Sequence, residues 1–446
     1  MTGIKARLTY YLNEGISPLS LAIFRIAFGV LMLFSGIRFL LKGWLYEFYI
    51  QPDFFFKYYG FEWISPLPEF WMYVLYAAML LAALGICLGY YYRLSTLVFF
   101  IGFNYFELLD KTYYLNHYYL ISLISLWLIF IPANSYLSLD SWRKNSTANS
   151  IPRYFVTVLQ LQLAIVYLYA GLAKVSSDWL IEAMPMAIWL KQFNPASTLG
   201  QLMHHPYTAY IFSWAGCIYD CCIVFFLLMP KTRIWAYVAV VIFHVATWLL
   251  FPIGVFPFVM IALTLIFFSP EELKKGLQKL HIALPAFTNF AAPKKNWVLK
   301  TAFATFLVFQ LGFPLRSWIY PGDVLWHEQG FNFSWRVMRV EKSGIATFYV
   351  KDADSQKQTE VYNPDFLTPL QEKMMVHQAD FILQYARFLA EIAPSYYGIK
   401  NPEVYADIFV SQNAGPMQRF IDANAELSKK TDSWKSKNWI LAKNHE

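Results

Sequence analysis

The sequence predicts an all-α polytopic membrane bundle of about nine transmembrane helices, followed by a small extracytoplasmic α+β domain. Three observations support this prediction: an apolar composition, a series of long apolar runs, and basic residues concentrated in alternate loops. Of the 446 residues, 57% are hydrophobic and 15% are charged, whereas soluble domains average about 45–50% apolar and about 25% charged residues. The composition excludes a disordered chain, a collagen-like chain and an ordinary soluble enzyme.

The apolar runs define the predicted spans. A helix needs about 20 apolar residues to cross the hydrocarbon core of a bilayer. Nine segments reach or approach this length: 18–41, 69–89, 93–107, 118–135, 154–175, 207–230, 234–250, 254–269 and 297–317. The third, seventh and eighth runs are short, so a bundle of eight spans is the alternative.

The basic residues orient the bundle, because cytoplasmic loops are enriched in lysine and arginine. With a cytoplasmic N-terminus, the inside loops contain Lys5, Arg7, Arg93, Arg143, Lys144, Arg153, Lys231, Arg233, Lys274, Lys275, Lys279, Lys294 and Lys295. The outside loops then contain only Lys42, Lys57, Lys111 and Lys191. We therefore predict a multi-pass integral protein of a bacterial inner membrane, with a retained first span, a cytoplasmic N-terminus and an extracytoplasmic C-terminal domain.

Metal and nucleic-acid binding are not predicted. The four cysteines all lie within apolar runs, and none has the spacing of zinc ligands: Cys87, Cys217, Cys221 and Cys222. The formal net charge of +7 is modest. Because the basic residues lie in short loops, membrane topology explains them better than binding to nucleic acid does.

The composition changes near residue 318, which divides the chain into a transmembrane domain, 1–317, and an extracytoplasmic domain, 318–427. Residues 347–351 and 359–362 are expected to form short strands joined by a turn at 352–355. Residues 366–392 have apolar residues at helical spacing and are expected to form a helix that ends before Pro394. The basic segment 428–446 is expected to be a loosely ordered tail.

Ionisable groups within the spans are the candidate functional residues, because each costs at least about 2.5–3.5 kcal/mol at membrane depth. They are Arg25, Glu107, Asp110, His117, Lys174, Asp220 and His244. Lys174 ends an outward span and His117 begins an inward one, so both are expected at the outer boundary of the membrane. Arg25 and Asp220 are interpreted as a structural charge pair.

Lys174 has two interpretations. Its long side chain could extend to the lipid headgroups. Its small neighbours, Ala170 to Ala173, instead suit a lysine buried against adjacent helices. A histidine such as His117 is, by itself, more often an interfacial residue than a catalytic one.

The segment around Lys174 belongs to an ordered series of motifs. Residues 170–175 read Ala-Gly-Leu-Ala-Lys-Val and are followed by Asp178-Trp179. The others are Asn116–Leu120, Asp220, Phe243-His244, Ile253–Phe256, Phe333–Trp335, Asn363-Pro364, His377 with Asp380, Gln384–Ala386 and Asp407–Asn413. In this order the set resembles the vitamin K-dependent γ-glutamyl carboxylases, of the wider horizontally transferred transmembrane (HTTM) domain family. Their corresponding segment reads Ala-Gly-Val-Lys-Lys-Leu, and Lys174 matches its second lysine.

The resemblance implies an enzyme of the carbon–carbon lyase class. Oxidation of a reduced naphthoquinone (vitamin K or a menaquinol) by O2 to its epoxide would be coupled to removal of a glutamyl γ-proton and addition of CO2. Lys174 would be the initiating base, and His117 would handle protons or hydrogen bonds in the later stages. Asn116 and His244 are weaker candidates for cofactor binding. The partners would be a glutamyl side chain of a protein or peptide, membrane lipid and the quinone.

Two other functions stay open. The protein could oxidise or epoxidise a quinol without carboxylating a protein, and a carboxylated product would separate these cases. It could also be a non-catalytic membrane protein of the same fold, which would show no quinone dependence. The natural substrate, recognition of a propeptide, the natural quinone and the oligomeric state are left undetermined.

Overall fold

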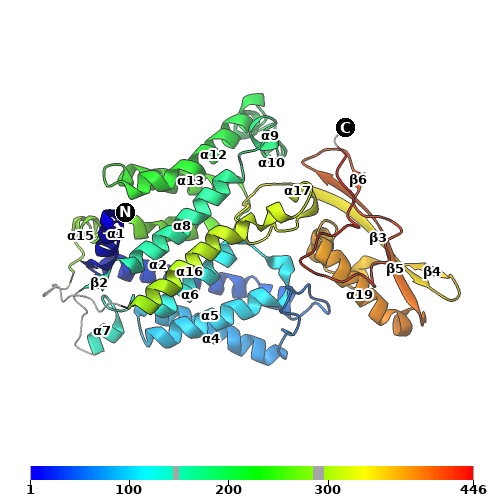
Figure 1. Ribbon diagram of the computed structural model, residues 1–446, viewed down its shortest axis with the longest axis horizontal. Helices are drawn as coiled ribbons and strands as arrows, with labels where there is room; N and C mark the ends of the chain where they lie inside the picture. Colours follow the sequence, from blue (N-terminus) through cyan, green and yellow to red (C-terminus); the bar gives the residue numbers. More distant parts are fainter. Residues whose placement is uncertain (1, 144–149, 285–295, 445–446) are drawn as a thin grey trace.

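The computed structural model consists of a helical bundle with a mixed α/β region packed against one end (Figure 1). It describes residues 2–143, 150–284 and 296–444. Three basic residues used to orient the bundle, Lys144, Lys294 and Lys295, lie outside the described residues. We call residues 1–317 the bundle and residues 318–444 the C-terminal domain.

Six helices in the described part of the chain are long and apolar enough to cross a membrane. They are α2 (Leu19–Leu41), α4 (Glu69–Leu88), α8 (Tyr154–Leu172), α12 (Pro206–Leu228), α13 (Arg233–Leu250) and α16 (Trp297–Gly312), which continues into the 3₁₀ helix η3 (Phe313–Ile319). A seventh span is formed if α14 (Phe256–Thr264), η2 (Leu265–Phe267) and α15 (Pro270–Lys279) count as one bent unit.

The predicted number of nine spans is not confirmed. Helices do form at the remaining two predicted positions, α5 (Tyr92–Leu109) and α6 (Asn116–Phe130). Polar residues, including Arg93 and Glu107, lower the hydropathy of α5, and α6 has only 15 residues. The bend of 114° between the two parts of the α14–α15 unit explains why this run also falls short of a straight span.

Shorter elements lie at the two ends of the bundle. They are α1 (Thr2–Asn13), α3 (Trp44–Tyr49), η1 (Lys111–Tyr113), α7 (Leu139–Arg143), α9 (Ser177–Leu180), α10 (Met186–Leu190), α11 (Thr198–Met203) and the paired strands β1 (Gly15–Ile16) and β2 (Ile151–Pro152). Figure 1 shows α1, α7 and α15 at one end and the C-terminal domain at the opposite end. The N-terminus therefore lies far from the C-terminal domain.

The C-terminal domain contains a four-stranded antiparallel sheet of order β4-β3-β5-β6. Its strands are β3 (Lys342–Asp352), β4 (Gln358–Glu360), β5 (Pro402–Gln412) and β6 (Gln418–Arg419). The remaining elements are α17 (Val324–His327), η4 (Asn363–Asp365), α18 (Pro369–Met375) and α19 (Ala379–Tyr396), the last of which packs on β3 and β5. The predicted β3–β4 hairpin is present, with Val350 opposite Thr359.

Two expectations for this domain are wrong. The predicted single helix is two helices, and the second continues through Pro394 to Tyr396. A proline there lacks the N–H that would bond to the carbonyl four residues earlier, but α19 ends two residues later, so the disturbance is confined to the end of the helix. The tail is not loose along its described length. Trp439 is buried in the domain core, and Ile440 forms a β-bridge with Ile421.

At their boundary, each of the two regions inserts a side chain into the hydrophobic core of the other. Trp335 of the C-terminal domain is fully buried in the core of the bundle. In the other direction, Phe56 of the bundle stacks on Phe381, with ring centroids 4.0 Å apart. The amide of Gln371 donates to Asp110 at 2.9 Å. These contacts fix the C-terminal domain over the end of the bundle where Lys174 lies.

Candidate functional site

Lys174 lies two residues beyond the end of α8. Gly171 lets this end of α8 approach α12 closely, because a Cβ atom there would lie 2.7 Å from the backbone nitrogen of Cys221. The Lys174 side chain turns into the bundle, where the residue is 6% exposed. Of its two interpretations, the structure therefore shows the buried one.

The Lys174 ammonium has three close neighbours. Its Nζ donates to Asp220 Oδ2 at 2.7 Å and to the carbonyl oxygen of Ala170 at 3.1 Å. It also lies 5.5 Å from the ring centroid of Trp179. Burial disfavours both charges of the Lys174–Asp220 pair, whereas their mutual contact favours both. The two groups therefore form one unit that is sensitive to the loss of either member.

The expected pairing of Arg25 with Asp220 is wrong. Arg25 is fully buried on α2. It donates to four backbone carbonyl oxygens, those of Ile86, Cys87, Ala133 and Leu137. The first two belong to the last turn of α4, where carbonyls have no partner within the helix. A guanidinium has five donors and can be satisfied by such carbonyls without a carboxylate, so Asp220 is left to bind Lys174.

A small cavity of about 80 Å³, the Lys174 cavity, adjoins the ion pair. Lys174, Asp220 and His244 all line it. His244 Nε2 lies 3.3 Å from the hydroxyl of Tyr167, whereas its Nδ1 is buried and has no hydrogen-bond partner among the described residues. Aromatic rings and methionine side chains make up much of the remaining wall: Trp179, Phe212, Phe243, Phe251, Phe256, Met186, Met260 and Met338.

The other two candidates lie near this cavity but do not line it. His117 is buried, and its ring centroid lies 5.6 Å from that of Phe256, which in turn lies 5.8 Å from that of His244. The Phe256 ring therefore links the two histidines across the cavity wall. Asn116 accepts a hydrogen bond from Tyr114 at 3.2 Å, on the side of the C-terminal domain.

A set of contacts that we call the Arg339 clamp connects the Lys174 segment to the C-terminal domain. Arg339 donates to the carbonyl oxygen of Ala173 at 2.6 Å and to both carboxylate oxygens of Asp178, at 2.9 and 2.6 Å. Asn413, at the end of β5, donates to the same carboxylate at 3.3 Å. Burial alone raises the pKa of Asp178, but the hydrogen bonds from Arg339 and Ser176 outweigh it and hold this pKa below its usual value.

The segment that carries Arg339 has an unusual backbone. Phe333, Trp335 and Met338 all have positive φ angles, between 50° and 59°, which cost about 1–3 kcal/mol each for residues other than glycine. Trp335 is held by burial and by stacking on Tyr119 at 4.8 Å. Met338 lines the Lys174 cavity, and Phe333 lines a second cavity. The strained segment therefore runs from one cavity to the other.

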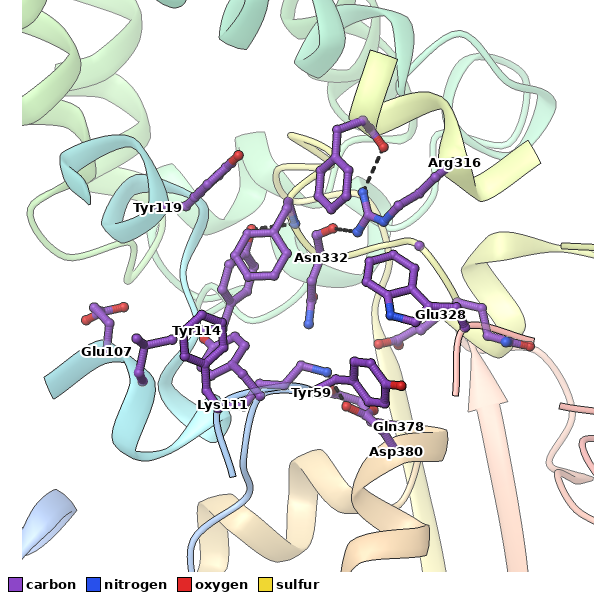
Figure 2. A pocket seen from close by; sticks show the side chains of 18 of the residues that line it. Tyr59, Glu107, Lys111, Tyr114, Tyr119, Arg316, Glu328, Asn332, Gln378 and Asp380 are labelled. Atoms are coloured by element: carbon purple, nitrogen blue, oxygen red, sulfur yellow. Dashed lines mark hydrogen bonds and ion pairs between the residues drawn. The ribbon is translucent and has the colours of Figure 1, made fainter. Parts of the chain in front are cut away.

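The second cavity, which we call the junction cavity, is much larger, at about 630 Å³. Figure 2 shows Glu107, Lys111 and Tyr114 of the bundle on one side and Arg316, Asn332 and Glu328 on the other. This volume is in the range of small-molecule sites, about 300–1,000 Å³. The junction cavity contains none of the predicted catalytic or cofactor-binding residues.

Two family models together match most of the chain. Residues 13–271 match the HTTM domain, and residues 295–446 match the lumenal domain of vitamin K-dependent gamma-carboxylase. The chain belongs to the γ-glutamyl carboxylase family. The sequence resemblance to these carboxylases is thereby confirmed. No significant match among solved structures was found.

For this member of the carboxylase family, sequence reasoning missed three features of the site. It did not foresee the Lys174–Asp220 pair, the Arg339 clamp or the contact of Tyr167 with His244. Asp178-Trp179 and Asn413 were noticed as motif positions, and the structure places both at the Lys174 segment. Arg339 gave no such signal, since it is one of several basic residues after the last span.

Proposed function

We propose that this protein is an integral-membrane γ-glutamyl carboxylase that uses a reduced naphthoquinone, O2 and CO2. The observation that carries the proposal is a buried lysine, paired with a carboxylate and facing an aromatic cavity, in a chain that matches both domains of the carboxylase family. Lys174 is the proposed initiating base, and the proposed substrate is a glutamyl side chain of a protein or peptide.

The lining of the Lys174 cavity fits a reduced naphthoquinone. Aromatic side chains present flat apolar surfaces, and the unpartnered Nδ1 of His244 can accept a hydrogen bond from a phenolic hydroxyl. The cavity of about 80 Å³ is smaller than such a molecule needs. Met186, Met260 and Met338 line it, and methionine side chains adjust readily to the shape of a ligand. Lys174, His244 and the aromatic wall would hold the quinol ring.

Lys174 must accept a proton if it is the base, although its contact with Asp220 favours the ammonium. The short hydrogen bond resolves this conflict, because the ammonium proton can move to Asp220 Oδ2 and leave a neutral amine and a neutral acid. In a low-dielectric site this neutral form competes with the ion pair. We infer that Asp220 holds the proton while the Lys174 amine receives one from the ligand.

The bound quinol, on reaction with O2, would supply the strong base that removes the glutamyl γ-proton, which no side chain can do unaided. The residues of this chain bind, orient and exclude water. His117 is assigned a proton-handling or hydrogen-bonding role in the later stages, from the opposite side of Phe256. Asn116 is assigned a supporting role at the start of α6.

The test is an assay of purified protein with a reduced naphthoquinone, a glutamyl peptide and labelled bicarbonate. Both labelled peptide and quinone epoxide are measured. Lys174→Ala should lower both rates together, by about 10²–10⁴-fold for loss of a general base, and a small added amine should restore part of the activity. His117→Ala should keep some epoxidation and lose carboxylation. Arg419→Gln, on the surface of the C-terminal domain, is the control.

The outcomes separate the rival functions. Normal epoxidation in Lys174→Ala would remove Lys174 from the role of base. Epoxide without labelled peptide in the wild-type protein would show a quinol epoxidase instead of a carboxylase. Neither product, with no effect of quinone on thermal stability, would favour a non-catalytic protein of the same fold.

The proposed orientation places the C-terminal domain outside the cytoplasm of a bacterium. It is supported by the distribution of basic residues and by the position of α1 and α15 at the end opposite to that domain. Reporter fusions after Lys144 and Lys279 should be cytoplasmic, and a fusion at the C-terminus should be extracytoplasmic. A cytoplasmic C-terminal reporter would overturn the orientation.

A further inference from the structure

The junction cavity continues as a groove along one face of α6. Tyr119, Ser122, Leu123 and Leu126 line it, and their spacing of three and four residues places them on one side of the helix. From Tyr119 to Leu126 this face extends about 10 Å along the helix axis. Because α6 runs away from the C-terminal domain, the groove extends from the domain junction into the depth of the bundle.

The sides of the groove are mostly apolar, with Asn104, Glu107 and Gln310 as polar exceptions, and they come from two helices, α5 and α16. Phe100 and Leu108 of α5 form one side, and Phe306 and Phe309 of α16 form the other. Helix α5 packs mainly on α4 and α6, whereas α16 packs on α8. Phe309 is 51% exposed on the outer surface of the bundle. The groove therefore opens between α5 and α16, on a surface that faces lipid in a membrane.

Charged groups at the domain end of the junction cavity are mostly paired. Lys111 pairs with Asp380, Lys437 pairs with Asp432 at 2.7 Å, and Glu328 pairs with Lys342 at 2.9 Å. These pairs neutralise one another and leave little attraction for a charged ligand.

Arg316 differs from these groups. It donates to the carbonyl oxygen of Phe313 at 3.0 Å, to the Ser334 hydroxyl at 3.1 Å and to the carbonyl oxygen of Asn332. All three acceptors are neutral, and Arg316 has no ion pair within the described part of the chain. Figure 2 shows Arg316 at the edge of the cavity, with Asn332 beside it and pointing into it. The junction cavity thus joins a guanidinium that has no ion pair among the described residues to a long, mostly apolar groove.

We propose that the junction cavity binds one glycerophospholipid from the adjacent leaflet of the membrane. The phosphate contacts Arg316, because a guanidinium is well suited to phosphate oxygens. One acyl chain lies in the groove along α6, where it packs against the apolar side chains of α5 and α16. A free anion would leave the groove empty, and a lipid without phosphate would leave Arg316 unneutralised, so this site requires both parts.

This proposal is independent of carboxylation, and so is its test. The full chain is purified in detergent, stripped of lipid and mixed with phosphatidylglycerol, phosphatidylethanolamine, diacylglycerol or inorganic phosphate. Retained adducts are counted by native mass spectrometry. One phospholipid of either kind should stay bound to the wild-type protein, diacylglycerol should bind at least tenfold more weakly, and inorganic phosphate should not compete.

Two variants test the two halves of the site. Arg316→Gln should weaken phospholipid binding about tenfold, Arg316→Lys should weaken it less, and Arg419→Gln should leave it unchanged. Ser122→Phe should block the groove and reduce binding without touching the charge. Equal binding of diacylglycerol, competition by phosphate, unchanged binding in Ser122→Phe, or displacement of the phospholipid by a naphthoquinone would each overturn the proposal.

Discussion

The two cavities of this protein lie on either side of one short segment, yet they are built in opposite ways. The Lys174 cavity is small, with a volume of about 80 Å³, and contains an ion pair whose members are both buried. The junction cavity is large, with a volume of about 630 Å³, and contains a guanidinium with neutral partners. The segment from Phe333 to Met338 runs from one cavity to the other.

The difference shows how one membrane protein can keep a proposed catalytic site, the Lys174 cavity, apart from a proposed ligand-binding site, the junction cavity. A small aromatic site leaves little room for water, which strengthens the electrostatic interactions inside it. A large site with an unneutralised charge attracts a ligand but cannot exclude water in this way. We therefore expect substitutions in the Lys174 cavity to cost more stability than substitutions in the junction cavity, and four predictions test this ranking.

The largest expected effect is at Asp220. Asp220→Ala leaves the Lys174 ammonium buried without its partner, and breaking such a pair costs about 3–5 kcal/mol. The double variant Lys174→Met/Asp220→Leu removes both charges and should recover most of the stability, but no activity. Thermal and denaturant unfolding in detergent measure the effect. Equal stability of Asp220→Ala and the wild-type protein would show that the loss of its carboxylate partner costs the Lys174 ammonium little free energy.

The second prediction concerns pH, at a carboxylate beside the junction cavity. Burial alone raises the pKa of Glu328, but the charges of Lys342 and His377 outweigh it and lower this pKa to about 2. The usual value is 4.5, so the carboxylate stabilises the folded state fully above that pH and loses its contribution as the pH falls toward 2. A shift of this size corresponds to about 3 kcal/mol.

The measurement compares the wild-type protein with Glu328→Gln between pH 6 and pH 2. Titration of all other acidic groups occurs in both proteins and cancels in the difference. The wild-type advantage in unfolding free energy should therefore be largest at pH 6 and should shrink as the pH falls. A difference that is independent of pH would contradict the lowered pKa of Glu328.

The third prediction concerns the wall between the cavities. Arg339→Gln removes the hydrogen bonds that hold Asp178 and the carbonyl of Ala173. A hydrogen bond to a charged group contributes at most about 1.5–3 kcal/mol to stability. We expect a loss of about 2 kcal/mol and faster acylation of Lys174 by an amine-reactive probe, detected by peptide mass spectrometry. Arg419→Gln breaks an exposed pair and should cost less than about 1 kcal/mol.

A double-mutant cycle with Asp178→Asn decides whether the Arg339 clamp is one unit. Residues in one hydrogen-bonded network couple by about 0.5–3 kcal/mol. Additive losses from Arg339→Gln and Asp178→Asn would show that the two residues act separately. Unchanged acylation of Lys174 in Arg339→Gln would show that the clamp stabilises the domain without positioning the lysine.

The sequence predicted the helices better than it predicted the pairing of charges. Apolar runs located a helix at every expected span, because burial in lipid requires long apolar segments, but α5 and α6 show that such a run need not meet the length and polarity of a full span. The C-terminal hairpin was expected, whereas β5 was missed. Its signal was present, since Val404, Ala406, Ile408 and Val410 alternate and are buried.

The candidate site shows where sequence reasoning stops. The depth argument selected Lys174 as a candidate, and the structure brings it together with Asp220 and His244. The partner of each charge could not be deduced, because it depends on which helices pack together. Gly171 allows α8 to approach α12 and so brings Lys174 to Asp220. Arg25 instead donates hydrogen bonds to backbone carbonyl oxygens. Partners of this kind cannot be recognised from the pattern of side chains in a sequence.

The smallest expected effect is in the wall of the junction cavity. The hydroxyl of Tyr119 and the side-chain amide of Gln310 contact each other at 2.8 and 3.1 Å. Tyr119→Phe keeps the stacking on Trp335 but leaves the amide without this partner, which costs about 1 kcal/mol when the group can reach some water and up to about 3 kcal/mol when it cannot. Because this cavity is large enough to hold water beside the amide, we expect the lower value. Tyr119→Phe/Gln310→Leu removes both polar partners and should be nearly as stable as the wild-type protein. A loss of about 3 kcal/mol in the single variant, measured by denaturant unfolding, would mean that the junction cavity excludes water as the Lys174 cavity does and would remove the contrast between them.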